Sequence, residues 1–237
     1  MNKAGREVLL LAHGSKSPDY SAACEVFLDG WEQYSGMHSR LGFLEQCEPL
    51  LEDVLAEASS RSRMLIVLPL LLNAGKHLRQ DIPDRLAGFK QQHPETELHL
   101  ANGLTDVGVV AETLYDRITG IQADVQSIIL LTHGSRQSGV QQHIMQLADT
   151  LAERAGTKVH IAFAGYGSPS LEAILAGQTG KETVAIVPHF LFPGGWMKQV
   201  CADMDTFRRA HSTTELVLAK YLGAHPLLLR LLLQQME

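Results

Sequence analysis

The chain repeats itself, and this internal duplication constrains the fold more than any other feature of the sequence. The octapeptide VLLLAHGS at residues 8–15 returns as IILLTHGS at residues 128–135, an offset of 120 residues. A second pair, LPLLLNAGKH at residues 68–77 and VPHFLFPGGW at residues 187–196, is offset by 119 residues. A unit that recurs at a fixed period is one structural module used twice. We therefore expect two similar domains, residues 1–120 and 121–237, related by a pseudo-twofold axis.

Each half alternates short apolar runs with longer amphipathic segments, a pattern typical of parallel strands connected by helices. The predicted strands are residues 8–12, 41–45, 64–70 and 97–101 in the first half, and 127–132, 158–164, 183–188 and 215–219 in the second. The predicted helices follow Ser17, Pro49 and Pro83, lie around residues 109–118, and then cover 139–154, 168–176, 197–210 and 226–235. The predicted fold class is α/β, with two similar domains that each contain a parallel four-stranded sheet flanked by helices.

Two of the predicted helices carry further expectations. The first has apolar residues at helical spacing, and they predict its buried stripe: Ala23, Phe27, Trp31 and Tyr34. The last, LLLRLLL at residues 227–233, is apolar nearly all round, which fits either a buried terminal helix or an oligomer contact.

Composition excludes several classes of protein. Of the 237 residues 45% are hydrophobic, which argues against disorder, and the net charge of −6 is spread without the basic stripe of a nucleic-acid-binding protein. No apolar run is long enough to cross a membrane, and we expect no signal peptide before the first predicted strand. The three cysteines form no CxxC pair, and no phosphate-binding glycine motif follows a strand. We expect a cytoplasmic protein that binds neither nucleic acid nor membranes.

Three side chains that can bind metal follow three different strands of the first half. His13 comes after the first predicted strand, Glu45 closes the second, and His77 lies beyond the third. Ligands of parallel α/β sheets bind beyond the carboxyl ends of the strands, where these residues converge. Imidazole and carboxylate suit first-row divalent ions, and histidine also exchanges protons near neutral pH. The sequence therefore predicts a metal site and a proton acceptor at this edge.

The second half has lost two of the three groups. His133 repeats His13, but Gly165 stands in place of Glu45 and Trp196 in place of His77. We therefore expect the metal site in the first domain and a degenerate repeat in the second. His133 is then a remnant of the duplication.

Two segments, LLLAHGSKSPDY from Leu9 and LPLLLNAGKHLRQDIP from Leu68, resemble the CbiX/SirB family of sirohydrochlorin chelatases. The resemblance covers both halves and implies a chelatase-like fold. It also implies insertion of Co²⁺ or Fe²⁺ into sirohydrochlorin during cobalamin or siroheme biosynthesis. The family's metal-site histidines fall on His13 and His77, and an acidic residue falls on Glu45. The resemblance implies no cofactor beyond the substrate ion and a monomer built as an internal pseudo-dimer. The imidazole and carboxylate ligands would also suit Ni²⁺.

A polycarboxylate macrocycle needs cationic and aromatic neighbours, and we expect Lys16, Lys76, Arg79 and Trp196 to contact it. His189, just after a predicted strand of the second half, could line the same binding site. Two rival functions remain open at this stage: a non-catalytic carrier of tetrapyrrole or metal, and a metal-dependent hydrolase that activates water.

Overall fold

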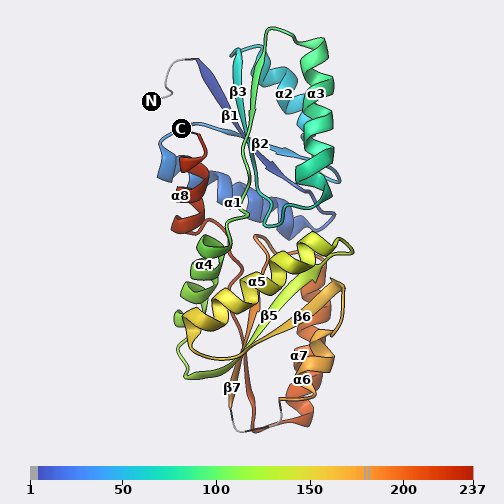
Figure 1. Ribbon diagram of the computed structural model, residues 1–237, viewed down its shortest axis with the longest axis vertical. Coiled ribbons are helices and arrows are strands. Elements are labelled where there is room, and N and C mark those ends of the chain that lie inside the picture. Colours follow the sequence, from blue (N-terminus) through green and yellow to red (C-terminus); the bar gives the residue numbers. More distant parts are fainter. Residues whose placement is uncertain (1–4, 179, 181, 237) are drawn as a thin grey trace. The chain divides into compact units, whose positions relative to one another are not determined.

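The structure is a computed structural model, and it describes residues 5–178, 180 and 182–236. The chain forms two compact units (Figure 1). The first unit contains the chain up to Thr105 together with the segment from Gly223 onward. The second unit is the continuous segment Asp106–Leu222.

The first unit is built on a four-stranded parallel sheet with the strand order β2-β1-β3-β4. Its elements are β1 (Arg6–Ala12), α1 (Pro18–Ser35), β2 (Arg40–Phe43), α2 (Leu51–Ser59), β3 (Met64–Pro69), η1 (His77–Asp81), α3 (Ile82–Gln92), β4 (Glu97–Leu100) and α8 (Pro226–Gln234). The inner strands β1 and β3 are buried on both faces, which explains their continuous apolar sequences.

The second unit repeats this sheet in the order β6-β5-β7-β8, again with parallel strands. Its elements are α4 (Val107–Thr119), β5 (Val125–Gly134), α5 (Ser138–Ala155), β6 (Val159–Tyr166), α6 (Leu171–Leu175), β7 (Thr183–Pro188), α7 (Trp196–Ala210) and β8 (Glu215–Leu218). The two sheets therefore have the same topology, and both match the fold class expected from the sequence.

The compact units do not coincide with the repeats at residues 1–120 and 121–237. Helix α4 ends the first repeat in the sequence but belongs to the second unit, where it lies beside α5 (Figure 1). Helix α8 ends the second repeat but belongs to the first unit, where it lies beside α1 (Figure 1). The last helices of the two repeats are thus exchanged.

Side-chain packing explains the position of α8. Its residues Leu228, Leu229 and Leu232 are buried, and the Gln235 side chain donates a hydrogen bond of 2.8 Å to the Gly103 carbonyl. The helix buries one face only, so the expectation of a buried terminal helix holds for that face.

Two details of the predicted elements are wrong. Tyr34 is 43% exposed, and the buried stripe of α1 is formed by Cys24, Phe27 and Trp31. Helix α3 begins at Ile82, directly after the π-helical turn η1, because the helical backbone already starts at His77. Within the described residues, no helix is long and apolar enough to cross a membrane.

Candidate metal site

The topology of the first sheet brings the predicted residues to one place. The chain moves from β1 to β2 on one side and then returns to β3 on the other, so β1 and β3 flank the switch point of the sheet. Parallel α/β sheets bind ligands beyond the carboxyl ends of the strands at such a point. His13 directly follows β1, and His77 opens η1 in the segment after β3. Glu45 lies two residues beyond the end of β2.

The three side chains meet there. The Nε2 atoms of His13 and His77 are 3.1 Å apart, and the two rings meet edge to face at 78°. The Oε1 atom of Glu45 lies 3.6 Å from Nε2 of His13. The side chains of His13, His77 and Glu45 are 35%, 44% and 50% exposed, so an ion from solvent can reach them.

Hydrogen bonds on the far side of each ring determine which nitrogen carries the hydrogen. Nδ1 of His13 lies 3.0 Å from the Gly14 carbonyl oxygen, and Nδ1 of His77 lies 2.9 Å from Oδ2 of Asp81. A carbonyl and a carboxylate only accept hydrogen bonds, so both Nδ1 atoms must donate. In the neutral rings both Nε2 atoms are then left as lone pairs that face each other.

Two converging lone pairs repel unless a proton or a metal ion lies between them. Nitrogen ligands lie about 2.0–2.1 Å from a divalent ion such as zinc, so two imidazoles on one ion are separated by roughly 3.0–3.4 Å. The observed 3.1 Å falls in this range. Within the described parts of the chain, no group of three His, Cys, Asp or Glu side chains has the geometry of a complete metal site. The arrangement is a pair of nitrogen ligands with a carboxylate nearby.

Asp81 was not identified from the sequence, although it lies in the segment that carries the family resemblance. Its carboxylate orients His77 through one oxygen and binds Nζ of Lys76, at 3.1 Å, through the other. The hydrogen bond from Lys76, together with the charges of Lys76 and His77, keeps the pKa of Asp81 below its ordinary value. The spacing of four residues from His77 to Asp81 within a helical turn is the signal that could have revealed this pair.

The loops after β1 and β2 are joined by their backbones. The Glu45 amide donates to the His13 carbonyl at 3.0 Å. Gly14 has a φ of 101°, and a Cβ atom at this position would lie 1.6 Å from the Glu45 carbonyl oxygen. Glycine is therefore required there, because any side chain would separate His13 from Glu45.

Cys47 joins the same two loops through its side chain. Its sulfur accepts a hydrogen bond from the Ser15 amide at 3.3 Å and donates one to the Ser15 carbonyl at 3.0 Å. Both backbone groups of Ser15 are thus bound by one thiol, two residues away from His13. This contact was also missed in the sequence, because a single cysteine gives no pattern.

The other predicted site residues lie in different surroundings. Lys16 and Arg79 are exposed in segments that follow β1 and β3, whereas Lys76 is paired with Asp81. Trp196 belongs to the second unit, where its ring stacks on Phe190 with centroids 4.0 Å apart.

His189 is also in the second unit, but it is 3% exposed rather than open to a ligand. Its Nδ1 is 3.5 Å from the Thr132 hydroxyl, and Nε2 has no hydrogen-bond partner among the described residues. Burial, and to a smaller extent the nearby His143, lower its pKa to about 3. His189 is therefore a neutral core residue of the second unit.

At the equivalent edge of the second unit, the His133 ring lies against Gly165. A Cβ atom on Gly165 would lie 2.8 Å from Nε2 of His133 and 2.9 Å from its Cε1. The ring of His133 therefore covers the backbone at the position where the first unit has Glu45.

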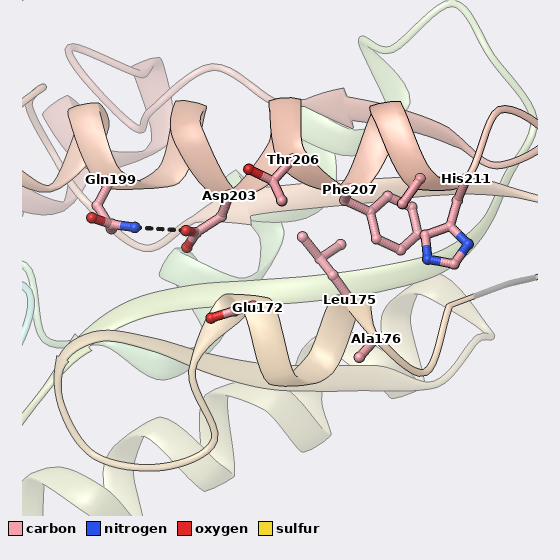
Figure 2. A pocket seen from close by; sticks show the side chains of 9 residues that line it. Glu172, Leu175, Ala176, Gln199, Asp203, Thr206, Phe207 and His211 are labelled. Atoms are coloured by element: carbon pink, nitrogen blue, oxygen red, sulfur yellow. Dashed lines mark hydrogen bonds between the residues drawn. The ribbon is translucent and has the colours of Figure 1, made fainter.

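A surface pocket of about 360 Å³ lies between α6 and α7 of the second unit (Figure 2). Glu172, Asp203 and His211 line it, and the Gln199 side chain donates to Asp203 at 2.6 Å. Figure 2 shows these side chains on the two helices, with the Phe207 and His211 rings close together. None of the predicted site residues lines this pocket, so it is separate from the histidine pair.

The fold and the site together define a class: a duplicated parallel α/β protein with one histidine pair at the switch point of its first sheet. The model of the CbiX family matches residues 7–121 and again residues 127–237, and the chain belongs to this family. The two matches agree with the duplication seen in the sequence.

Some relatives with assigned activities match nearly the whole chain, and others match only about half of it. The sirohydrochlorin ferrochelatase of Bacillus subtilis is 24% identical over 226 residues, which are 92% of this chain and 86% of the relative. The sirohydrochlorin cobaltochelatase of Saccharolobus solfataricus is 30% identical over 119 residues, which are 47% of this chain and 91% of the relative. The second relative therefore has the length of a single repeat.

Solved structures agree on the fold. SirB from Bacillus subtilis with Fe³⁺ superposes with a TM-score of 0.82 at 23% identity and covers 98% of this chain and 94% of that one. The sirohydrochlorin chelatase SirB of Bacillus subtilis subspecies spizizenii, in complex with cobalt, gives a TM-score of 0.81 at 22% identity, with coverages of 98% and 93%.

Proposed function

We propose that the protein inserts a divalent metal ion, Co²⁺ or Fe²⁺, into sirohydrochlorin in the pathway to cobalamin or siroheme. The observation that carries this proposal is the pair of Nε2 atoms, 3.1 Å apart, at the switch point of a CbiX-family sheet. The ferrochelatase and cobaltochelatase names of the relatives support the reaction and the substrate.

The reaction exchanges one dication for two protons, and the histidine pair suits this exchange. The macrocycle must lose two pyrrole protons as it takes up the ion. When the ion leaves His13 and His77, their two lone pairs face each other again, and each can accept a proton. The charge held at the site is then unchanged.

Weak binding of the ion is part of the same mechanism. Two imidazole nitrogens and a half-exposed carboxylate leave the remaining coordination positions of a divalent ion to water or substrate. Such an ion exchanges ligands easily, whereas thiolates would hold it tightly. In this proposal His13 and His77 bind the ion, Glu45 assists proton removal, and Asp81 orients His77.

The substrate-contact residues and the molecular context are part of the proposal. Lys16 and Arg79 are exposed and can bind carboxylates of the macrocycle, and Trp196 can contact its face. We infer that the metal site belongs to the repeat 1–120, with 121–237 as the degenerate copy. We also infer that the protein acts as a cytoplasmic monomer, needs no cofactor besides the substrate ion, and can accept Ni²⁺ as an alternative ion.

The decisive experiment mixes the purified protein with sirohydrochlorin and Co²⁺, Fe²⁺ or Ni²⁺ without oxygen and follows the visible spectrum. A chelatase converts many equivalents of the macrocycle to the metallated form. A carrier would bind one equivalent of macrocycle or metal without forming product. A hydrolase would leave the macrocycle spectrum unchanged, and either result would contradict the proposal.

A further inference from the structure

Three exposed side chains of the second unit are in contact at the carboxyl end of its sheet. His133 lies near the end of β5, Tyr166 ends β6, and Arg136 lies between β5 and α5. The guanidinium carbon of Arg136 is 4.8 Å from the centroid of the Tyr166 ring. The rings of His133 and Tyr166 are 5.6 Å apart at 68°. We call Arg136 and Tyr166 the Arg136–Tyr166 platform, and His133 lies beside it.

The platform occupies the position that corresponds to the metal site of the first unit. His133 repeats His13, and Arg136 repeats Lys16, both at an offset of 120 residues. Glu45 has become Gly165, whose missing side chain leaves the space that the His133 ring now fills. A metal site cannot form around His133 without moving this ring.

The second unit has lost the carboxylates of this edge and kept two of its cations. At an offset of 119 residues, Asp81 has become the buried Val200, so both carboxylates of the first site are lost. Arg79 has been kept as a cation, the exposed Lys198. The first edge carries both cations and carboxylates, whereas the matching positions of the second edge keep cations and no carboxylate.

Arg136 is available for an anionic ligand. Among the residues that the structure describes, no carboxylate lies within ion-pair distance of Arg136, and Tyr166 beneath it is 51% exposed. The cation–π contact restrains the guanidinium group without using its planar N–H edges. Those edges match a carboxylate in two-pronged geometry.

Aromatic surface lies at the same end of this sheet. Phe190 follows β7, the neighbour of β5, and its ring stacks on Trp196 at the start of α7. Arg136 on Tyr166 can bind a carboxylate, and the stacked pair Phe190–Trp196 after β7 offers an aromatic surface. Together these groups suit a flat ligand with carboxylates on its rim.

We propose that the Arg136–Tyr166 platform binds a rim carboxylate of the tetrapyrrole and so determines the affinity for a polycarboxylate macrocycle. This inference rests on the proposed function, because sirohydrochlorin supplies the carboxylates. In this proposal Arg136 contacts a carboxylate of the macrocycle and takes no part in binding the metal ion.

The test compares Arg136→Gln with Arg209→Gln, an exposed arginine near the opposite end of α7. Binding of metal-free sirohydrochlorin is followed by its absorbance, and binding of Co²⁺ alone by its visible spectrum. Loss of one charge-assisted carboxylate contact raises the Kd for the macrocycle about tenfold in Arg136→Gln. The Kd for Co²⁺ stays unchanged in both variants. In Arg136→Gln the KM for the macrocycle rises, while kcat stays within about twofold of the parent value.

Further measurements test whether the contact depends on the charge of Arg136 and on the carboxylates of the macrocycle. Arg136→Lys restores part of the affinity, and Tyr166→Phe keeps it because the ring remains. A macrocycle with esterified carboxylates binds the parent and Arg136→Gln equally. High salt weakens binding to the parent more than to Arg136→Gln.

The outcomes separate this inference from the proposed function. Equal macrocycle affinity in Arg136→Gln and Arg209→Gln overturns the platform, whether or not the parent is active. Parent protein that binds sirohydrochlorin through Arg136 but forms no metallated product overturns the chelatase function and leaves the platform standing. Parent protein that does not bind the macrocycle overturns both.

Discussion

At the scale of single residues, each histidine of the pair has a partner that only accepts hydrogen bonds. The Gly14 carbonyl and the Asp81 carboxylate hold the hydrogens on the Nδ1 atoms. The two Nε2 atoms therefore turn their lone pairs toward each other, and this arrangement favours binding of a positively charged ion between them.

The first prediction is that both histidines of the pair are required. His13→Ala and His77→Ala lower kcat/KM for metal insertion at least about a hundredfold, since neither nitrogen alone can exchange the ion for two protons. His133→Ala, the matched control, keeps most of the turnover number because no ligand set surrounds it in the part of the chain that the structure describes. Initial rates and circular dichroism of the three variants check this. Equal losses in His133→Ala and His13→Ala would assign a catalytic role to the second unit.

The second prediction concerns Asp81, which acts on the metal through His77. Asp81→Asn weakens Co²⁺ binding about 10- to 100-fold, as is usual when the carboxylate behind a metal-binding histidine is lost. The Lys76 partner is a useful control, because Lys76→Met removes its charge and leaves the contact between Asp81 and His77. Titration of Co²⁺ into each variant measures the affinity. An unchanged affinity in Asp81→Asn would show that metal binding does not depend on the orientation of His77 by Asp81.

The third prediction is a pH dependence of stability caused by His189. Burial lowers its pKa to about 3, below the value of about 6.5 expected in the unfolded chain. Its contribution to stability is therefore complete above pH 6.5 and is lost as the pH falls toward 3. His189→Leu, which copies Leu70 of the first repeat, removes this dependence of about 1 kcal/mol per pH unit.

Chemical denaturation at pH 7.5 and pH 5 measures this effect. The stability of His189→Leu relative to the parent should rise as the pH falls. A difference that is the same at both pH values would mean that His189 does not titrate between the folded and unfolded states.

The sequence located much of the candidate site but missed its supporting residues. His13, Glu45 and His77 are found because each follows a buried strand, and parallel strands end at one edge. Asp81 and Cys47 are missed because their role depends on one contact each, to His77 and to Ser15. Hydrophobic periodicity carries no information about such contacts.

At the scale of elements, the π-helical turn η1 places His77 and Asp81. The turn from His77 to Asp81 contains one more residue than an α-helical turn, and π-helical turns are frequent at functional sites. The spacing of apolar residues predicted α3 but not η1. One extra residue in a single turn hardly changes the spacing of apolar residues along a helix. The eight strands were predicted well because the inner ones are continuous apolar runs.

The fourth prediction tests the contact between the loops after β1 and β2. Cys47→Ala removes both hydrogen bonds to Ser15, so the loop that carries His13 moves more freely and kcat/KM falls several-fold. Cys47→Ser can keep one of the bonds and should lose less. Cys201→Ala, at an exposed position of the second unit, is the control for loss of a thiol. Steady-state rates rank the three variants, and full activity in Cys47→Ala would exclude a positioning role.

At the scale of the whole molecule, the repeats and the compact units follow different boundaries. Helix α4 buries Val110, Ala111, Leu114 and Ile118 within the second unit, and Glu112 binds Arg154 of α5 through two hydrogen bonds of 2.7 and 3.0 Å. The sequence could not reveal this exchange, because either sheet could accept a helix with the same apolar face.

The fifth prediction is that the unit, rather than the repeat, folds by itself. A fragment of residues 106–222 unfolds cooperatively, since it keeps the whole second unit. A fragment of residues 121–237 lacks α4 and loses roughly 5 kcal/mol or more of apolar burial. Thermal denaturation and size-exclusion chromatography of both fragments test this. A cooperative transition for residues 121–237 would mean that α8 can replace α4.

The exchange of helices also reverses the usual order of folding during synthesis. Domains generally fold from the N-terminus as the ribosome extends the chain. Here α8 is synthesised after the whole of residues 106–222, although it packs in the first unit beside α1. The unit with the histidine pair is therefore completed last. A nascent chain arrested before Pro226 carries a finished second unit and a first unit that still lacks a helix.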